Sequence, residues 1–197
     1  MDILSYLNMN KLNGEIIHGN AAYISTRVKE LAQVESARKK LIGTRIGVIG
    51  APSDWLISSI ASPVAVKQKL GIEIVNIAID EVVDAYNAIA DTPSDCATLA
   101  EKATTKATKE AVPGAVKLYY ALKEVVSRHR LNGFTIRCFD LLGVVRNTSC
   151  YALARLNAEG IVAGCEGDIP TLLTMMITKA VTGVSGFQAN PSRIDPK

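Results

Sequence analysis

Short apolar runs alternate along this chain with longer segments in which apolar residues recur at helical spacing. Four runs have the length and β-branched content of strands, and they span residues 45–50, 72–79, 134–139 and 161–164. The runs are apolar on both sides, which indicates burial of both faces, and the helical segments between them favour parallel pairing. The pattern therefore predicts an α/β fold, a doubly wound and mainly parallel sheet with helices on both faces, Rossmann-like or flavodoxin-like.

The residues before the first of these runs form a separate part. Residues 1–44 are predicted to be a helical lead-in, with helices over residues 2–11 and from the cap Asn20 to just before Gly43, and with a short strand at residues 15–18. The rest of the chain, residues 45–197, is predicted to be one central α/β domain.

Two further elements are expected inside that domain. The Pro113-Gly114 pair lies within a long helical stretch and is expected to divide it into two helices near Ala111. Residues 187–190 are expected to form a last short strand.

Composition excludes several classes of protein. The chain is 48% hydrophobic with a net charge of +3, and its one tight basic cluster, Arg38-Lys39-Lys40, comes at an expected helix end, where cations suit the terminal carbonyls. We therefore predict no nucleic-acid partner. No apolar run is long enough for a membrane span, and the four cysteines form no C-x-x-C pair. These features predict a protein of the reducing cytoplasm with no membrane partner.

Two carboxylates follow the last long strand run. The sequence GCEGDIPT places Glu166 and Asp168 after residues 161–164, at the carboxyl end of a buried strand, where open α/β sheets bind their ligands. Asp168 precedes a helix with Pro170 in its first turn, so we interpret it as the helix cap. Glu166 has no such structural role, and we predict that it faces a crevice and binds a ligand.

Three stretches together resemble one family of sugar isomerases. GCEGDIPTLLTMMITKAVTGVSGFQANPSRID is similar to the central part of the L-fucose isomerase and L-arabinose isomerase superfamily. RIGVIGAPSDWLISSIASPVAVKQKLGIEIVNI resembles the family's first strand, pocket loop and second strand, and FTIRCFDLLG resembles the strand before the active-site glutamate. The resemblance covers most of residues 45–195.

The resemblance implies an aldose–ketose isomerase that uses a divalent cation, Mn²⁺, and an enediol mechanism. Glu166 matches the family's catalytic glutamate, which is also a metal ligand. Asn190 falls where fucose isomerases have a second metal ligand, an aspartate, and an amide cannot accept a proton as a carboxylate does. The third ligand, a histidine, belongs to a later domain, and His18 and His129 are interpreted as surface or helix-end residues. We therefore expect a central-domain fragment that is inactive alone and binds manganese weakly, from a full-length protein that is a homo-oligomer.

The resemblance also implies sugar contacts from the loop after the first strand run. Ser53, Asp54 and Trp55 are expected to bind substrate, and Trp55 is equally open to a packing role. Arg137 and Asp140 flank the end of another strand, and Asp140 is expected either to reach the crevice or to have a salt-bridged or capping role.

A second class of function stays open. The chain has no G-x-G-x-x-G and no G-K-[ST] phosphate motif, so a nucleotide-binding domain is disfavoured. The alternative to the enzyme is a sugar-binding or regulatory relative that has lost catalysis through Asn190.

Overall fold

A four-stranded, entirely parallel sheet forms the centre of the protein. The computed structural model describes residues 2–195. The strands are β1 (Arg45–Ile49), β2 (Glu73–Ile77), β3 (Gly133–Ile136) and β4 (Val162–Cys165), in the order β2-β1-β3-β4. All three strand pairs are parallel, with Ile46 of β1 opposite both Ile74 of β2 and Gly133 of β3. The predicted sheet and its four strands are confirmed, and the strand order is that of a flavodoxin-like sheet.

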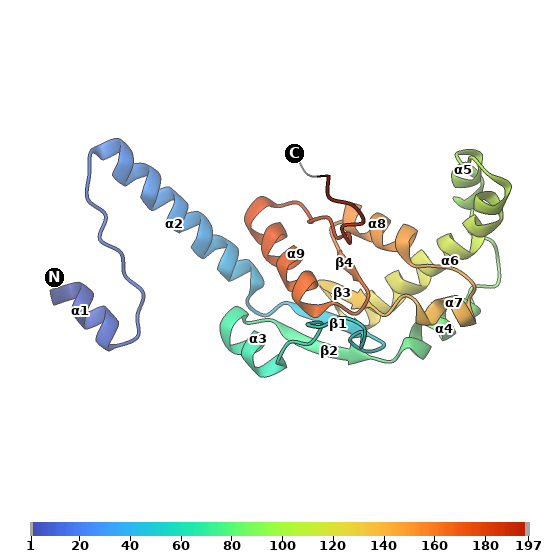
Figure 1. Cartoon of the computed structure of the whole chain (residues 1–197), viewed down its shortest axis with the longest axis horizontal. Helices are drawn as coiled ribbons and strands as arrows, with labels where there is room; N and C mark the ends of the chain where they lie inside the picture. Colours follow the sequence, from blue (N-terminus) through green and yellow to red (C-terminus); the bar gives the residue numbers. More distant parts are fainter. Residues whose placement is uncertain (1, 196–197) are drawn as a thin grey trace.

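Helices connect the strands and cover both faces of the sheet (Figure 1). These helices are α3 (Pro63–Leu70), α4 (Ile79–Ala88), α5 (Cys96–Glu101), α6 (Lys106–His129), α7 (Asp140–Val144), α8 (Cys150–Ala158) and α9 (Ile169–Thr182). One apolar core lies between α4, α6, α8 and the sheet face that carries Phe134 and Ile136. The other lies between α3, α9 and the opposite face, which carries Ile46 and Val162. Because both faces are covered, the strands are apolar on both sides, as their sequence predicts.

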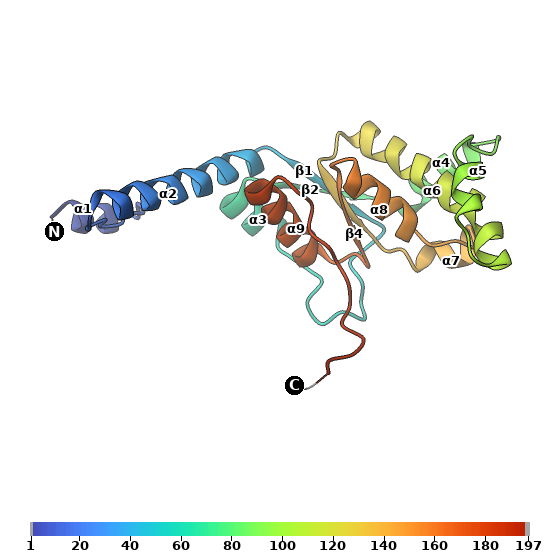
Figure 2. The ribbon, with the colours of Figure 1, turned by 90° about the horizontal axis from the view of Figure 1, so that it is seen from above.

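An N-terminal arm of two helices precedes the sheet. Helix α1 (Asp2–Met9) and helix α2 (Ala21–Leu41) extend away from the α/β body in both ribbon views (Figures 1 and 2). The predicted cap is present, because the Asn20 side chain accepts a hydrogen bond from the Tyr23 backbone amide at 2.9 Å. Only Ala37 and Leu41 of α2 are buried.

The short strand expected at residues 15–18 is wrong. Residues 12–18 form neither helix nor strand and are mostly exposed. A strand needs a neighbour for its backbone hydrogen bonds, and the arm brings no strand beside this segment.

Two further expectations inside the domain are wrong. Helix α6 runs through Pro113 without a break, and the interruption lies earlier, between Glu101 and Lys106. Thr105 caps α6, and burial of Val112 and Val116 on either side of the proline offsets the lost backbone hydrogen bond. Residues 187–190 form no strand, and a side chain from this segment, described below, bonds the edge of β4 instead.

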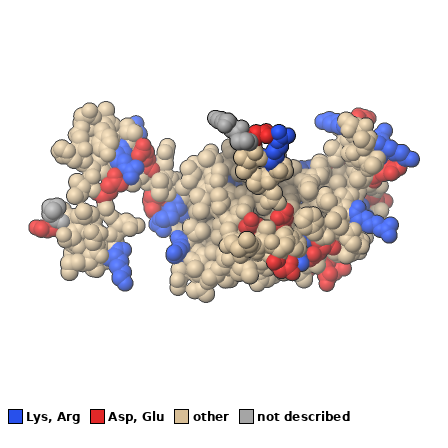
Figure 3. All heavy atoms as spheres, in the orientation of Figure 1, with Lys and Arg blue, Asp and Glu red and all other residues tan. Residues whose placement is uncertain are grey.

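Charged side chains are unevenly distributed over the face of the protein seen in Figure 3. On this face, several acidic side chains lie over the middle of the α/β body, and basic side chains gather where α2 meets the body and around α5.

Among residues 2–195, no helix combines the length and the apolar character that crossing a membrane requires.

Candidate functional site

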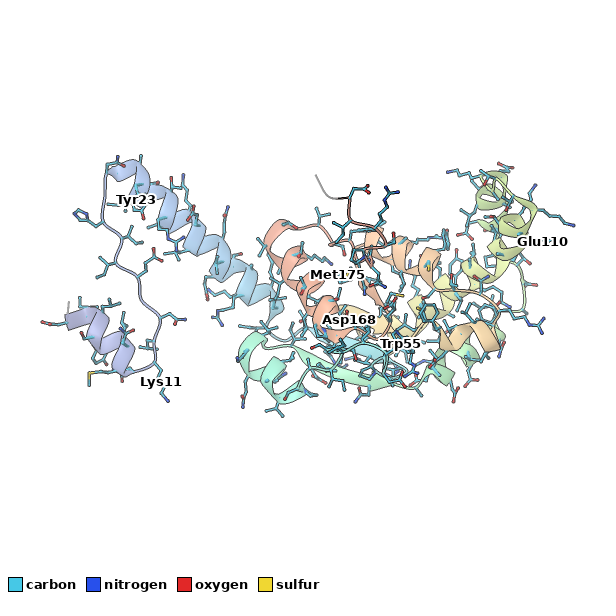
Figure 4. All side chains as sticks on the ribbon, viewed as in Figure 1. Lys11, Tyr23, Trp55, Glu110, Asp168 and Met175 are labelled. Atoms are coloured by element: carbon cyan, nitrogen blue, oxygen red, sulfur yellow. The ribbon has the colours of Figure 1, made fainter. Side chains whose placement is uncertain are left out.

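The loops that follow β1, β3 and β4 meet at the carboxyl edge of the sheet. The connection from β1 leads to β2 on one side, and the connection from β3 leads to β4 on the other, so the sheet has its topological switch point between β1 and β3. Open α/β sheets bind ligands at this point. Figure 4 places Trp55, from the loop after β1, and Asp168, from the turn after β4, at this edge.

Glu166 lies on a tight turn with an unusual backbone. The Asp168 amide donates to the Cys165 carbonyl at 3.2 Å, and the two residues between them, Glu166 and Gly167, have φ angles of 63° and 66°. Both are left-handed, a conformation that costs a residue with a side chain about 1 kcal/mol or more. The Gly167 amide also donates to the carbonyl of Ile136 in β3 at 3.1 Å, which ties the turn to the neighbouring strand. The surrounding structure therefore holds Glu166 in a strained conformation, as is common at functional sites.

The loop after β1 is packed directly against this turn. Ser53 is buried, and its hydroxyl donates to the Glu166 carbonyl. The hydroxyl of Ser59, also buried, donates in turn to the Ser53 carbonyl at 2.7 Å. A Cβ at Gly167 would lie 2.5 Å from the Ala51 carbonyl oxygen, so only glycine allows the two segments to approach this closely. The Ser53 hydroxyl therefore positions the Glu166 backbone.

The Glu166 carboxylate contacts Asn190, the residue that the family resemblance pairs with it. The Asn190 Nδ2 atom donates to Glu166 Oε1 at 3.0 Å. Both residues line a cavity of about 480 Å³ between α8, β4, α9 and the segment after α9. Trp55, Asp54 and Asp140 do not line this cavity.

Side-chain amides hold the outer edge of β4, next to that cavity. Gln188 accepts from the Cys165 amide at 2.8 Å and donates to the Cys165 carbonyl at 3.3 Å. Asn157 makes the same pair of bonds with Ala163, at 3.1 and 2.7 Å. These four bonds replace those of a fifth strand and satisfy an otherwise open sheet edge.

Asp168 is the helix cap that the sequence predicts. Its carboxylate accepts from the Thr171 amide at 2.9 Å and from the Thr171 hydroxyl at 2.6 Å. Each carboxylate oxygen accepts one of these two bonds, so both oxygens of Asp168 take part in the cap.

A second cluster lies at the end of β3, around Arg137. Its guanidinium is 3.1 Å from Asp140 and 3.4 Å from Asp54, and it lies 4.8 Å from the centre of the Trp55 ring. Trp55 also packs against Phe139, with ring centroids 5.7 Å apart, and both aromatic side chains are about half exposed. The structure thus brings together three of the predicted sugar-binding residues, with Asp140 in the salt bridge that was its alternative role.

Two cysteines beside Glu166 were not identified from the sequence. The Sγ atoms of Cys138 and Cys165 are 2.9 Å apart. Hydrogen bonds from the Cys165 thiol and the Glu166 backbone lower the pKa of Cys138 to about 6, and the same thiol contact, with burial, raises the pKa of Cys165. The signal available in the sequence was the position of each cysteine at the end of a predicted strand, but only the strand order makes them neighbours.

The described residues do not complete a metal shell. Glu166 and Asn190 provide one carboxylate and one amide, and no group of three histidine, cysteine or acidic residues suited to a metal occurs within residues 2–195. A cation such as Mn²⁺ takes about six donors. His129, the last residue of α6, is engaged elsewhere, because its Nε2 atom lies 2.8 Å from Glu81 of α4.

Comparisons with known proteins place these residues in a family context. The family model of the L-arabinose isomerase central domain matches residues 61–183, which include Glu166 but neither the loop with Trp55 nor Asn190. The sulfoquinovose isomerase of Clostridium sp. (strain MSTE9) is 29% identical over 106 residues, which cover 52% of this chain and 24% of that protein. The match therefore extends over about a quarter of the length of this curated relative.

Proposed function

The chain belongs to the L-arabinose isomerase central domain family, and from this premise we propose that it is the part of an aldose–ketose isomerase that carries the catalytic glutamate, Glu166. In this proposal the substrate is a sugar and the whole protein is a homo-oligomer. The observation that carries the proposal is the placement of Glu166, which lines a cavity of about 480 Å³ and sits on a strained turn at the carboxyl end of β4.

The proposed reaction needs one base that serves two neighbouring carbons. The Glu166 carboxylate takes the proton from C2 of the aldose while solvent water gives a proton to the carbonyl oxygen on C1, which forms the enediol. Glu166 then returns its proton to C1 while the hydroxyl on C2 gives its proton back to solvent, which forms the ketose. No oxidant or reductant is consumed. Asn190 holds one carboxylate oxygen at 3.0 Å and thereby orients the base.

The family resemblance adds manganese to this proposal, but the residues described here do not fit a complete site. Glu166 and Asn190 are only two ligand side chains, and the remaining donors must come from outside these residues or from solvent. We therefore expect this chain alone to bind Mn²⁺ weakly and to turn over no aldose.

The Arg137 cluster is the proposed place for further sugar contacts. Half-exposed Trp55 offers an aromatic face, and Asp54 and Asp140 offer hydrogen-bond acceptors. Ser53 acts in this proposal through the backbone of Glu166, since its hydroxyl is engaged there.

Calorimetric titration of Mn²⁺ tests the role of Glu166 in this chain. Glu166→Gln should abolish manganese binding, and Asn190→Asp should strengthen it because a charged oxygen replaces a neutral amide. Glu101→Gln, an exposed change of the same kind in α5, is the matched control and should bind as wild type does. Unchanged affinity in Glu166→Gln would overturn the metal assignment.

An isomerisation assay on the whole protein that contains this chain separates the enzyme from a sugar-binding relative. The panel consists of pentoses and 6-deoxyhexoses. It also includes sulfoquinovose, because the curated relative is named a sulfoquinovose isomerase. Turnover that Glu166→Gln abolishes supports the isomerase. Sugar binding without turnover favours the alternative, for which the presence of Asn190 in place of a second carboxylate is the supporting observation.

A further inference from the structure

The geometry points to Cys138 and Cys165 as a redox-sensitive thiol pair that closes reversibly to a disulfide directly beside Glu166. This inference concerns a modification site and does not depend on the isomerase proposal.

The two sulfur atoms are already close to bonding distance. They lie 2.9 Å apart, and a disulfide bond of about 2.05 Å requires them to approach by roughly 0.9 Å more. The register of the sheet brings them together, because Cys165 is opposite Ile136 and Cys138 follows Ile136 by two residues. The contact therefore joins the last residue of β4 to the short turn directly after the neighbouring strand β3.

The pair also has a route to a small oxidant. Cys138 is buried, with 4% of its surface exposed, whereas Cys165 lines the cavity of about 480 Å³ that also contains Glu166. The backbone of Cys165 is held by Gln188 and by the Thr135 hydroxyl, which donates to its carbonyl at 3.0 Å. Cys165 thus borders the cavity while its backbone is held next to Cys138.

The other two cysteines do not share this arrangement. Cys96 is buried in α5, and Cys150 is exposed at the start of α8 and lines the same cavity as Cys165. Within residues 2–195, the contact between Cys138 and Cys165 is the one recorded between two cysteine sulfurs. Cys150 is therefore an internal comparison that is more accessible to an oxidant than Cys165 but has no thiol in contact with it.

Hydrogen peroxide is the oxidant class that fits this access. In the first step the peroxide O–O bond breaks, an S–O bond forms at one sulfur of the pair, and one thiol proton leaves with the released oxygen as water. In the second step the other sulfur attacks the oxidised one, the S–S bond forms, and the S–O oxygen leaves with the remaining proton as a second water. Two electrons pass from the thiols to one peroxide, and a dithiol reductant returns them.

Closure of the bond would act on the turn that carries Glu166. Cys165 immediately precedes Glu166, and Cys138 leads into α7, so the disulfide would tie the strained turn to the end of β3. The site next to the carboxylate would then differ between the oxidised and reduced protein.

The test uses a chain in which this pair is the only source of thiols. The Cys96→Ser/Cys150→Ser double variant is treated with hydrogen peroxide, alkylated and analysed by intact mass and non-reducing peptide mapping. We expect a product about 2 Da lighter, because two hydrogens are lost, with a peptide that links Cys138 to Cys165 and is released by dithiothreitol. Oxidation of both thiols to sulfinic acid without a linked peptide, or no reaction, would overturn the inference.

Wild type provides the second arm. Oxidation of the exposed Cys150 shows that the dose of hydrogen peroxide is sufficient to react with a cysteine that lines the cavity. At this dose, the linked Cys138–Cys165 peptide should be the main disulfide product. A disulfide between Cys150 and Cys165, or oxidation of Cys150 with the pair left reduced, would refute the proposed site. Neither arm depends on a substitution at Cys138 or Cys165, so a folding defect in such a variant cannot obscure the result.

Discussion

Substitution of Gly167 by alanine tests whether close contact between the loop after β1 and the Glu166 turn holds the site together. The added Cβ would lie 2.5 Å from the Ala51 carbonyl oxygen and 3.1 Å from both Pro52 Cα and Ser53 N. All three atoms belong to the backbone, so no side chain can rotate away to make room. The loop must move, and its movement breaks the bond from the Ser53 hydroxyl to Glu166.

The expected cost has two parts. The left-handed φ of 66° at Gly167 costs alanine about 1–2 kcal/mol. Displacement of the packed backbone adds about 1–3 kcal/mol, as for other overpacked sites. Gly167→Ala should therefore lower the free energy of unfolding by about 2–5 kcal/mol.

Gly183→Ala is the matched control for this substitution. Gly183 ends α9 with a φ of 82°, and a Cβ there would have no atom within 4 Å. The control therefore has the conformational cost of about 1–2 kcal/mol without the contact. The difference between the two variants measures the close approach alone.

Thermal unfolding followed by circular dichroism is the assay. A chain of this size loses about 2–4 °C in Tm for each kcal/mol, so Gly167→Ala should melt roughly 2–12 °C below Gly183→Ala. The fluorescence of Trp55, the single tryptophan of the sequence, should change in Gly167→Ala because its loop moves. Equal melting temperatures and unchanged fluorescence would refute the argument that this contact positions the turn.

Two further changes test single contacts. Ser53→Ala leaves the Glu166 carbonyl without its partner and should cost about 1–3 kcal/mol in urea unfolding, whereas exposed Ser58→Ala should cost less than about 0.5 kcal/mol; equal losses would contradict the role of Ser53. The hydrogen bond to His129 lowers the pKa of Glu81 below its ordinary value of 4.5, so this stabilisation is present above pH 4.5 and is lost as the pH falls through the lower, folded value. Between about pH 5 and pH 3, the free energy of unfolding should therefore fall less in Glu81→Gln than in wild type. The difference should be under about 1 kcal/mol because the pair is partly exposed, and an equal fall in both proteins would contradict the prediction.

The sequence by itself determined the four strands of the sheet and most of the helices that pack on them. The four apolar runs became β1 to β4 because strands buried on both faces must be apolar on both sides, and that requirement is visible locally. Asp168 was likewise identifiable as a cap, since the bond from the Thr171 amide spans only three residues. Two short segments were predicted wrongly, because a strand also needs a neighbouring strand and composition does not show whether one is present. Residues 15–18 and 187–190 have strand-like composition, but no neighbouring strand pairs with them.

Only the tertiary structure decided how the site is assembled. The position of Glu166 after β4 was predictable, but its left-handed backbone depends on bonds from the turn to β3 and on the loop after β1. Cys138 and Cys165 are 27 residues apart in the chain, and their sulfurs meet because β3 and β4 are adjacent. The pattern of apolar and polar residues along the chain indicates the burial and local conformation of each segment. It does not report which segments become neighbours, because that follows from the packing of the whole sheet and its helices.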